Sequence, residues 1–583
     1  MIQIKKSPYI LETKIQYLKD FVFKVFQMPI FFLYALSFCS ILLAEPALIP
    51  TISPNEGIMP IIPDTSKAQF APSIDTSTNN IPIINITAPN QIGISNNHYL
   101  DFNVNARGII INNSIESITS TQLSGFITSN PNLSNSEANL ILNQVTSTHS
   151  SILKGSLEIA GKQAGLIIAN PNGITCQGCA FINTGDLTLS TGLITKNKSI
   201  PQSSIIPNPS RLAQLQDNQN LKHNFSLRVQ KGHINIDSLN AFPSTSLNLL
   251  AKSLSIHQKL YAKELNIILG SNQISLDEKG ALLLWQPIES KDITSKQEEF
   301  KLALDVAYLG GVYANSIYLI ASCANSLIDN KGIMATFPSL KEGDGGFVIQ
   351  SNGKIEITSA YIDNNYPNFS QNIYPVAFES IQSIGIEAKD NAPEPHFKYN
   401  RGFFASKDLS IQTYSLNNQS FIQSAGSILI KTQEELQNSG VIISKQNLKL
   451  SASTLSNIKG LIYAKDAFLI ASNLYNQDKA FIISDNISMQ AHTLFNDEAF
   501  IYATHSLDIQ AANIHNKVKL KTQKILIEQT HITKGDWEGY DEDDEEDDTG
   551  ELDPIRFLRD GDVDFERLVY EDRLDTAAYK PSS

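Results

Sequence analysis

"LQNSGVIISKQNLKLSAS" occupies residues 436–453, and near-copies of it follow closely. They read "LSNIKGLIYAKDAFLIAS" (455–472), "LYNQDKAFIISDNISMQA" (474–491), "LFNDEAFIYATHSLDIQA" (494–511) and "IHNKVKLKTQKILIEQ" (514–529). Each unit opens with an apolar residue, one further residue and an Asn. These anchors, spaced by 19, 19, 20 and 20 residues, are Asn438, Asn457, Asn476, Asn496 and Asn516. A near-constant period of this length indicates a stacked repeat architecture.

Apolar and polar residues alternate inside each unit, as Phe481 and Ile483 and then Ile487 and Met489 show. A period of two is typical of strands with one buried face. One such unit cannot bury that face alone, but copies stacked on one another can. We therefore expect a parallel β-solenoid with one repeat per coil. Asn suits its turns because Asn tolerates the left-handed conformation, and stacked Asn side chains can form ladders between coils. A β-sandwich with regularly spaced strands is the alternative.

The net charge of this 583-residue chain is concentrated at its C-terminal end. From Asp536 onward there are 19 Asp and Glu against 5 Lys and Arg, a charge of −14 that equals the net charge of the whole chain. The other residues hold 40 acidic and 40 basic side chains. No basic domain is left to neutralise phosphates, so we expect no nucleic-acid partner. The like-charged block predicts a disordered acidic tail over 535–583, with a short helix near 563–575.

The first 47 residues predict an export signal with a long, lysine-containing amino-terminal region. The apolar run "FFLYALSFCSILLA" (31–44) is too short to span a bilayer comfortably, and small residues near Ala44 and Ala47 provide cleavage sites. An uncleaved N-terminal anchor is the alternative. The Pro-, Ser- and Thr-rich segment 48–80 is interpreted as an extended leader. Residues 336–415 are interpreted as irregular coils and 416–534 as the repeat region.

Two Asn-Pro-Asn turns lie upstream of the repeats, forty residues apart. Pro fixes φ at the second turn position and the following Asn tolerates the left-handed conformation, so both turns predict stiff corners. Whether the corners act only in the fold or also touch a partner stays open. The first corner consists of Asn130, Pro131, Asn132 and Leu133, and the second of Asn170, Pro171, Asn172 and Gly173.

Cys176 and Cys179 could form a disulfide, contribute to a zinc site or act as a redox pair. A zinc site needs four ligands, and the chain has no second close Cys pair. A thioredoxin-type pair precedes a helix in a βαβ unit, which the pattern does not contain. An exported chain meets an oxidising compartment, so a disulfide is the prediction. Cys323 is expected to be a small buried hydrophobe. We expect no metal and no other cofactor.

Several segments upstream of the repeats occur in a fixed order. They are "SNNHYLDFNV" (95–104), "GIIINNS" (108–114), "NPNLSNSEANLILNQVT" (130–146), "IANPNGITCQGCAFINTGDLTLSTG" (168–192), "YAKELNIILGSNQI" (261–274) and "LDVAYLGGVYANSIYLIAS" (304–322). Together they resemble the N-terminal secretion domain of filamentous haemagglutinin-like proteins, which are exported by two-partner secretion. The downstream units resemble haemagglutinin repeats.

The resemblance implies a right-handed parallel β-helix with an N-terminal cap over residues 81–335. It also implies a partner, a dedicated outer-membrane β-barrel transporter whose periplasmic POTRA domains bind this domain. The chain would cross the membrane unfolded and fold outside, coil by coil. The residues of the two corners, 130–133 and 170–173, match the signature turns of the family.

We therefore expect an all-β exoprotein of the haemagglutinin or adhesin type, exported by a Gram-negative bacterium through Sec and the outer membrane. It would be monomeric, secreted or displayed on the cell surface, and would grip a host receptor or glycan. A truncated contact-dependent inhibition or haemolysin-type exoprotein is the alternative. A polysaccharide-degrading β-helix enzyme needs clustered carboxylates, and the repeats carry no recurring Asp pair, so no catalytic residue is expected.

Overall fold

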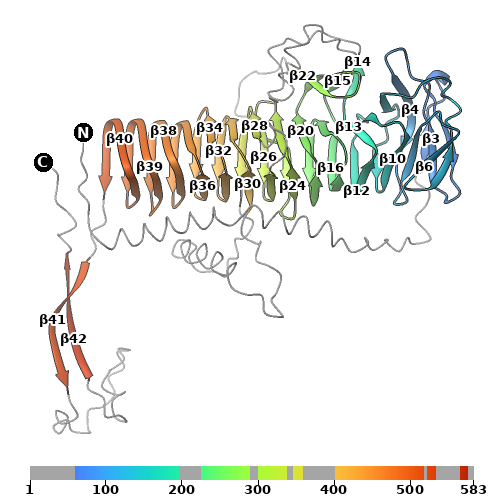
Figure 1. Ribbon diagram of the computed structural model, residues 1–583. Helices are drawn as coiled ribbons and strands as arrows, with labels where there is room; N and C mark the ends of the chain where they lie inside the picture. The colour runs from blue at the N-terminus through green and yellow to red at the C-terminus, as the bar shows by residue number, and fades with distance from the viewer. Residues whose placement is uncertain are drawn as a thin grey trace. The chain divides into compact units, whose positions relative to one another are not determined.

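The computed structural model describes residues 60–195, 225–288, 300–337, 346–358 and 401–517, with the backbone of two later strands. The predicted signal peptide, 1–47, lies outside the described residues. The main body is a solenoid whose strands pair in parallel with strands of the coils before and after them (Figure 1). The expected all-β parallel β-helix is confirmed, and the sandwich alternative is wrong because a sandwich would pair neighbouring strands in antiparallel.

A typical coil has three strands, each hydrogen-bonded to its equivalent in the next coil. Ser316–Ala321 (β25), Ser326–Asn330 (β26) and Ile333–Thr336 (β27) pair with Phe347–Ser351 (β28), Lys354–Ile357 (β29) and Gly402–Ala405 (β30). The solenoid strands before this coil are Ile109–Asn113 (β5), Leu140–Val145 (β8), Ser151–Leu153 (β9), Ser156–Gly161 (β10), Ala164–Ala169 (β11), Ile174–Ile182 (β12), Thr184–Ser190 (β13), His233–Asn240 (β16), Ser246–Ala251 (β17), Ser253–Ile256 (β18), Lys259–Tyr261 (β19), Glu264–Leu269 (β20), Lys301–Val306 (β23) and Gly311–Ala314 (β24).

An N-terminal cap precedes the first coil. Its elements are Ile61–Pro63 (β1), the 3-10 helix Ala68–Phe70 (η1), Ser73–Thr76 (β2), Pro82–Asn85 (β3) and Ile94–Phe102 (β4). The cap pairs β1 with β4 and β2 with β3 in antiparallel, and β3 and β4 then pair in parallel with β5 and β8. Residues 60–80 therefore belong to the cap, which corrects the interpretation of 48–80 as a leader. The side chains of Ile61 and Ile74 pack against the core, and this burial outweighs the turn-rich composition of the segment.

Two antiparallel additions interrupt the coils. A hairpin consists of Ile118–Thr121 (β6) and Gly125–Thr128 (β7). A four-stranded sheet covers part of one solenoid face and consists of Leu193–Thr195 (β14), Phe225–Val229 (β15), Asn272–Leu276 (β21) and Leu282–Pro287 (β22). Local alternation does not show these pairings in the sequence, because the strands of the sheet come from three separate segments.

The downstream coils continue the same stacking as far as Lys517. Their strands are Leu409–Thr413 (β31), Ser415–Asn418 (β32), Phe421–Ser424 (β33), Ile428–Thr432 (β34), Glu435–Asn438 (β35), Val441–Ser444 (β36), Asn447–Ile458 (β37), Leu461–Gln477 (β38), Phe481–Asp497 (β39) and Phe500–Lys517 (β40). Within the predicted irregular region 336–415, the described residues 346–358 and 401–415 form coil strands in register with their neighbours. Residues 359–400 lie outside the described residues.

Thr522–Ile532 (β41) and Phe565–Leu574 (β42) form a separate antiparallel pair. The predicted short helix near 563–575 is wrong, since that segment is strand β42. The last repeat unit, 514–529, does not end in a further parallel coil strand, because β41 pairs with β42. The register places Lys524 opposite Asp572, a pairing that alternation within one repeat could not indicate. Residues 533–564 of the predicted tail lie outside the described residues.

One continuous hydrophobic core fills the solenoid from Ile84 to Leu494. Beside it, each anchor Asn of the repeats donates through Nδ2 to Oδ1 of the anchor one coil later. The Nδ2–Oδ1 distances are 2.8 Å from Asn438 to Asn457, 2.9 Å from Asn457 to Asn476 and 2.8 Å from Asn476 to Asn496. The ladder also includes Asn418 before these residues and Asn516 after them.

The left-handed conformation is not what selects Asn at the anchors. Positive φ falls instead on Lys459, Asp478, Lys479 and Glu498, which follow the anchors in the turns. An anchor such as Asn457 is fully buried and also donates to the carbonyl oxygen of Phe481 at 3.1 Å. A carboxamide both donates and accepts, so it can continue a buried ladder in both directions.

Replacing Asn457 with Asp should lower the free energy of unfolding by about 2–4 kcal/mol. The carboxylate accepts from Asn438 but cannot donate to Asn476, and it brings a buried charge close to two oxygens. The measurement is the midpoint of chemical denaturation. Asn447→Asp, at the exposed first residue of the same strand, is the matched control and should cause little change. Equal midpoints for the two variants would show that the ladder does not stabilise the coils.

Candidate functional site

The first Asn-Pro-Asn corner is built around the buried side chain of Asn130. Its Nδ2 donates to the carbonyl oxygens of Asn112 at 2.8 Å and Ile86 at 3.0 Å. Its Oδ1 accepts from the backbone N–H of Asn132 at 2.8 Å, and its carbonyl oxygen accepts from the N–H of Leu133 at 3.1 Å. The same residue therefore closes the turn and ties it to strand β5 and to the residue that follows strand β3.

The second corner repeats this arrangement around the buried Asn170. The Nδ2 atom donates to the carbonyl oxygen of His149 and to Oγ of Ser151, both at 3.0 Å. The Oδ1 atom accepts from the N–H of Asn172 at 3.0 Å, and the carbonyl oxygen accepts from the N–H of Gly173 at 3.1 Å. Two corners forty residues apart thus share one hydrogen-bond pattern.

The second Asn of each corner also reaches across to another segment. Nδ2 of Asn132 donates to the carbonyl oxygen of Asn85 at 3.0 Å, and Nδ2 of Asn172 donates to that of Ser147 at 2.8 Å. Neither Asn132 nor Asn172 has positive φ, so the reason given from the sequence is wrong for both. The left-handed backbone in this pair of corners belongs to Gly173, at φ +116°. Asn is needed for its amide, and Gly for its backbone.

Only part of each corner is accessible to a partner. Pro131 and Asn132 are exposed and Leu133 is buried, while Pro171 and Asn172 are half-buried. Since the buried amides are committed to neighbouring strands, the corners first of all hold the coils together. The accessible residues stand on a surface whose shape those hydrogen bonds fix.

The first corner also closes the base of the β6–β7 hairpin, because the N–H of Asn130 donates to the carbonyl oxygen of Ser114 at 2.8 Å. The tip is held by Glu158 on β10, which is only 4% exposed. Its Oε1 accepts from the N–H of Gln122 at 2.7 Å and its Oε2 from the N–H of Leu123 at 2.8 Å. Sequence reasoning missed this clamp. The available signal was a lone acidic residue inside the apolar strand "SLEIAG".

The two faces of the hairpin differ. Ile127 points inward, where it packs against Ile83 and Ile110. Ile118 and Phe126 stand on the opposite face and are 67% and 77% exposed. A rigid hairpin with an apolar outer face therefore lies next to the first corner.

Replacing Glu158 with Gln should loosen the hairpin tip, because one of the two acceptor oxygens becomes an N–H₂ donor that faces a backbone N–H. We expect hydrogen-exchange protection at Gln122 and Leu123 to fall at least tenfold, which corresponds to the loss of about 1–3 kcal/mol. Glu116→Gln, at an exposed position at the hairpin base, is the control. Unchanged protection in Glu158→Gln would contradict the clamp.

Cys176 and Cys179 form a disulfide in β12, with 5.4 Å between their Cα atoms. Gln177 and Gly178 between them bulge outward, and the pairing with β16 shifts register at this point. Gly178 has φ +87°, which the bulge requires. Cys323 is half-buried, and its Sγ lies 3.2 Å from Nζ of Lys252. It is therefore not the buried apolar residue that we expected.

Peptide mapping of unreduced, secreted protein should recover Cys176 linked to Cys179. Cys323 is the internal control, because a half-buried free thiol should react with iodoacetamide in the same sample. Alkylation of all three cysteines without reduction would contradict the disulfide.

Within the described ranges, no group of three or more His, Cys, Asp or Glu side chains could hold a metal ion. In the same part of the chain, no helix has the length and apolar character needed to cross a membrane. Lys331 contacts two carboxylates, with its Nζ 3.7 Å from Oδ1 of Asp305 and 2.5 Å from Oδ2 of Asp329.

Residues 60–357, just over half of the chain, match the family described as the TPS (two-partner secretion) secretion domain. The chain is similar to a tRNA nuclease CdiA of Escherichia coli O6:K15:H31, with 29% identity over 422 residues, 72% of this chain and 11% of that protein. A 16S rRNA endonuclease CdiA of Enterobacter cloacae is 34% identical over 312 residues, 53% of this chain and 8% of that protein. The chain thus spans about a tenth of the length of these relatives.

A solved structure, the secretion domain of filamentous haemagglutinin, aligns with 64% of this chain and 93% of its own length. The sequence identity is 21% and the TM-score is 0.41.

Proposed function

The chain belongs to the TPS secretion domain family, and on that premise we propose that it is the exported member of a two-partner secretion pair, with an adhesive rather than enzymatic role. Proteins with this domain are secreted across the outer membrane of Gram-negative bacteria to the cell surface or the medium, through a TPS-family transporter. The observation that carries the proposal is the match over 60–357, which begins at the cap and ends with strand β29.

We also propose the route of export and the way in which the transporter recognises the chain. Residues 1–47 direct the chain through Sec, and the POTRA domains of the transporter then bind the domain that contains the two corners. We assign the corner residues a positioning role, because Asn130 and Asn170 are buried and hydrogen-bonded to neighbouring strands. The transporter would read the surface that they position, including the exposed Pro131 and Asn132.

The coils after residue 357 supply the adhesive part of the proposal. Their core is closed by stacking, which suits a monomeric rod that presents a receptor- or glycan-binding face outside the cell. The acidic segment after residue 535 has no assigned role.

A contact-dependent inhibition exoprotein is the second candidate. It is favoured by the relatives named as CdiA nucleases, whose similarity covers 72% of this chain in one case. In that proposal the part of this chain that is similar to the CdiA proteins provides export and extends the protein away from the cell. Toxicity resides in sequence that the similarity does not cover. Growth competition against unprotected neighbouring cells separates the candidates, since an adhesin alone leaves the neighbours viable.

Transporter dependence tests the proposed export route. The chain is expressed with and without a cognate TPS transporter, and culture medium, intact cells and protease-treated intact cells are compared by blotting. We expect the body of the protein outside, or removable by protease, only with the transporter. Protection inside the periplasm under both conditions would overturn the proposal.

Replacing Asn172 with Ile should reduce the secreted amount several-fold, because the variant loses the amide hydrogen bond to Ser147 and part of the corner. Asn135→Ile is the matched control, since Asn135 is exposed on the loop after the first corner. Periplasmic and external fractions are quantified for both variants. Normal export of Asn172→Ile would remove the corner from the mechanism while leaving transporter dependence untouched.

A further inference from the structure

One face of the solenoid changes its chemistry at the point where the four-stranded sheet ends. Leu250, Ile268 and Ile320 occupy the same register position on successive coils and are buried beneath that sheet. On the next two coils the same position is held by Gln350 and Gln412. The column is therefore apolar beneath the sheet and carries two carboxamides as soon as it leaves that cover, before Lys431 occupies the position on the following coil.

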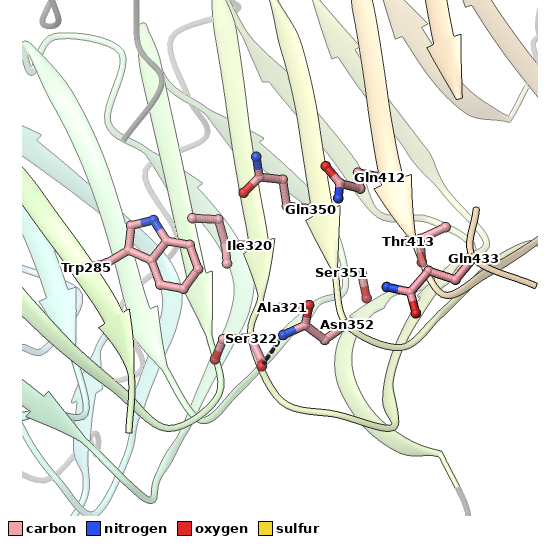
Figure 2. Close-up of a pocket in the computed structure, with 10 residues that line it drawn as sticks. All are labelled: Trp285, Ile320, Ala321, Ser322, Gln350, Ser351, Asn352, Gln412, Thr413 and Gln433. Atoms are coloured by element: carbon pink, nitrogen blue, oxygen red, sulfur yellow. Dashed lines mark hydrogen bonds between the residues drawn. The ribbon is translucent and has the colours of Figure 1, made fainter. Parts of the chain in front are cut away.

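Trp285 stands at this boundary. It lies on β22, the edge strand of the sheet, where it pairs with Ile274 and packs half-buried against the apolar cluster beneath. Figure 2 shows its indole ring at one end of a hollow, with Ile320, Gln350 and Gln412 following along the face. The hollow has a volume of about 130 Å³.

The floor of the hollow is itself fixed by hydrogen bonds. Nδ2 of Asn352 donates to the carbonyl oxygen of Ser322 at 2.7 Å, as the dashed line in Figure 2 marks. Oγ1 of Thr413 donates to the carbonyl oxygen of Gly353 at 2.7 Å. The floor is therefore pre-organised, which lowers the entropy cost of binding.

The available polar groups lie above this floor. Among the described residues, the side-chain amides of Gln350, Gln412 and Gln433 form no hydrogen bond with another protein group. Each of these amides can donate and accept at once. Parallel coils are about 4.8 Å apart, so the side-chain amides of Gln350 and Gln412, which are in register on successive coils, are presented one step apart along the solenoid axis. Gln433 lines the hollow from a different position, two residues after Lys431, which is in register with Gln412.

The chemistry of the lining selects one class of ligand. All lining residues are uncharged, whereas phosphate and sulfate groups are normally held by Arg or Lys. An apolar peptide anchor needs a predominantly apolar pocket, and this hollow has one aromatic ring among carboxamides and hydroxyls. Sugar hydroxyls donate and accept as carboxamides do, and the C–H face of a pyranose ring packs well on an indole.

We propose that the hollow beside Trp285 binds a neutral oligosaccharide. One pyranose ring packs on the indole, and the chain extends along the solenoid so that its hydroxyls meet Gln350, Gln412 and Gln433. This assignment is independent of the export route and adds a defined ligand class to the folded, exported protein.

Trp285 also provides the readout. The chain has two tryptophans, and replacing Trp537 with Phe leaves Trp285 as the sole indole reporter. The secreted variant is titrated with neutral tetrasaccharides, namely cellotetraose, chitotetraose, maltotetraose and β-1,4-galactotetraose. We expect at least one to give a saturable change in Trp285 emission.

Gln350→Ala and Gln412→Ala, made in the same Trp537→Phe background, should each weaken the best tetrasaccharide by about tenfold, as expected for the loss of one good hydrogen bond. Gln437→Ala, on β35 outside the hollow, is the control and should bind normally. Trp285→Ala should abolish saturation-transfer signals from the sugar while leaving the far-UV circular dichroism spectrum unchanged.

Three results would overturn the assignment. The first is the absence of any emission change with all four tetrasaccharides up to their solubility limits. The second is binding that Gln437→Ala weakens as much as Gln412→Ala, which would place the site elsewhere. The third is binding restricted to sulfated oligosaccharides, which would contradict a neutral ligand.

Discussion

Each coil of this protein is completed by its neighbour, and this constraint governs the rest of the structure. A parallel strand leaves half of its backbone N–H and C=O groups pointing toward the next coil, where an unmet group would cost as much as a lost hydrogen bond. A buried side chain that replaces a backbone partner at a turn must likewise find a hydrogen-bond partner on the next coil. The buried anchors do so with carboxamides, since Asn438 donates to Asn457 and Asn457 to Asn476 in an unbroken series. A residue able only to donate or only to accept would end that series.

The two Asn-Pro-Asn corners meet the same requirement where the coils are less regular. The amide of Asn130 donates to the carbonyl oxygen of Asn112 on β5, and that of Asn170 donates to the carbonyl oxygen of His149 and to Oγ of Ser151 on β9. The hairpin beside the first corner is attached by a different device, the carboxylate of Glu158, whose two oxygens accept from two adjacent N–H groups. In each case a buried polar side chain supplies the hydrogen-bond partners that the backbone of an additional strand would supply elsewhere.

The repeats could be predicted from the sequence because the signal is local: an Asn every 19 or 20 residues with alternation between. The structural reason for that Asn was only half predicted, since the ladder is present but the left-handed φ falls on Lys459 and Glu498 instead. Features that depend on contacts between distant segments were not predictable. Strand β42 pairs with β41 rather than forming a helix, and the cap recruits residues 60–80 from a segment that reads as a leader. Trp285 and Gln412 line one hollow only because the four-stranded sheet ends where it does.

Stacking also gives the molecule a direction. At its N-terminal end the antiparallel pairs β1–β4 and β2–β3 complete the cap, so the first coil meets a partner that is already formed. Every later coil pairs with the exposed strands of the coil before it. Nδ2 of each ladder Asn up to Asn496 donates to Oδ1 of the Asn on the next coil. A chain that emerges from its N-terminal end can therefore order itself as it appears, without closing long loops. The cap and the corners lie near the N-terminal end of the solenoid, where their hydrogen bonds hold the coils on which the later coils stack.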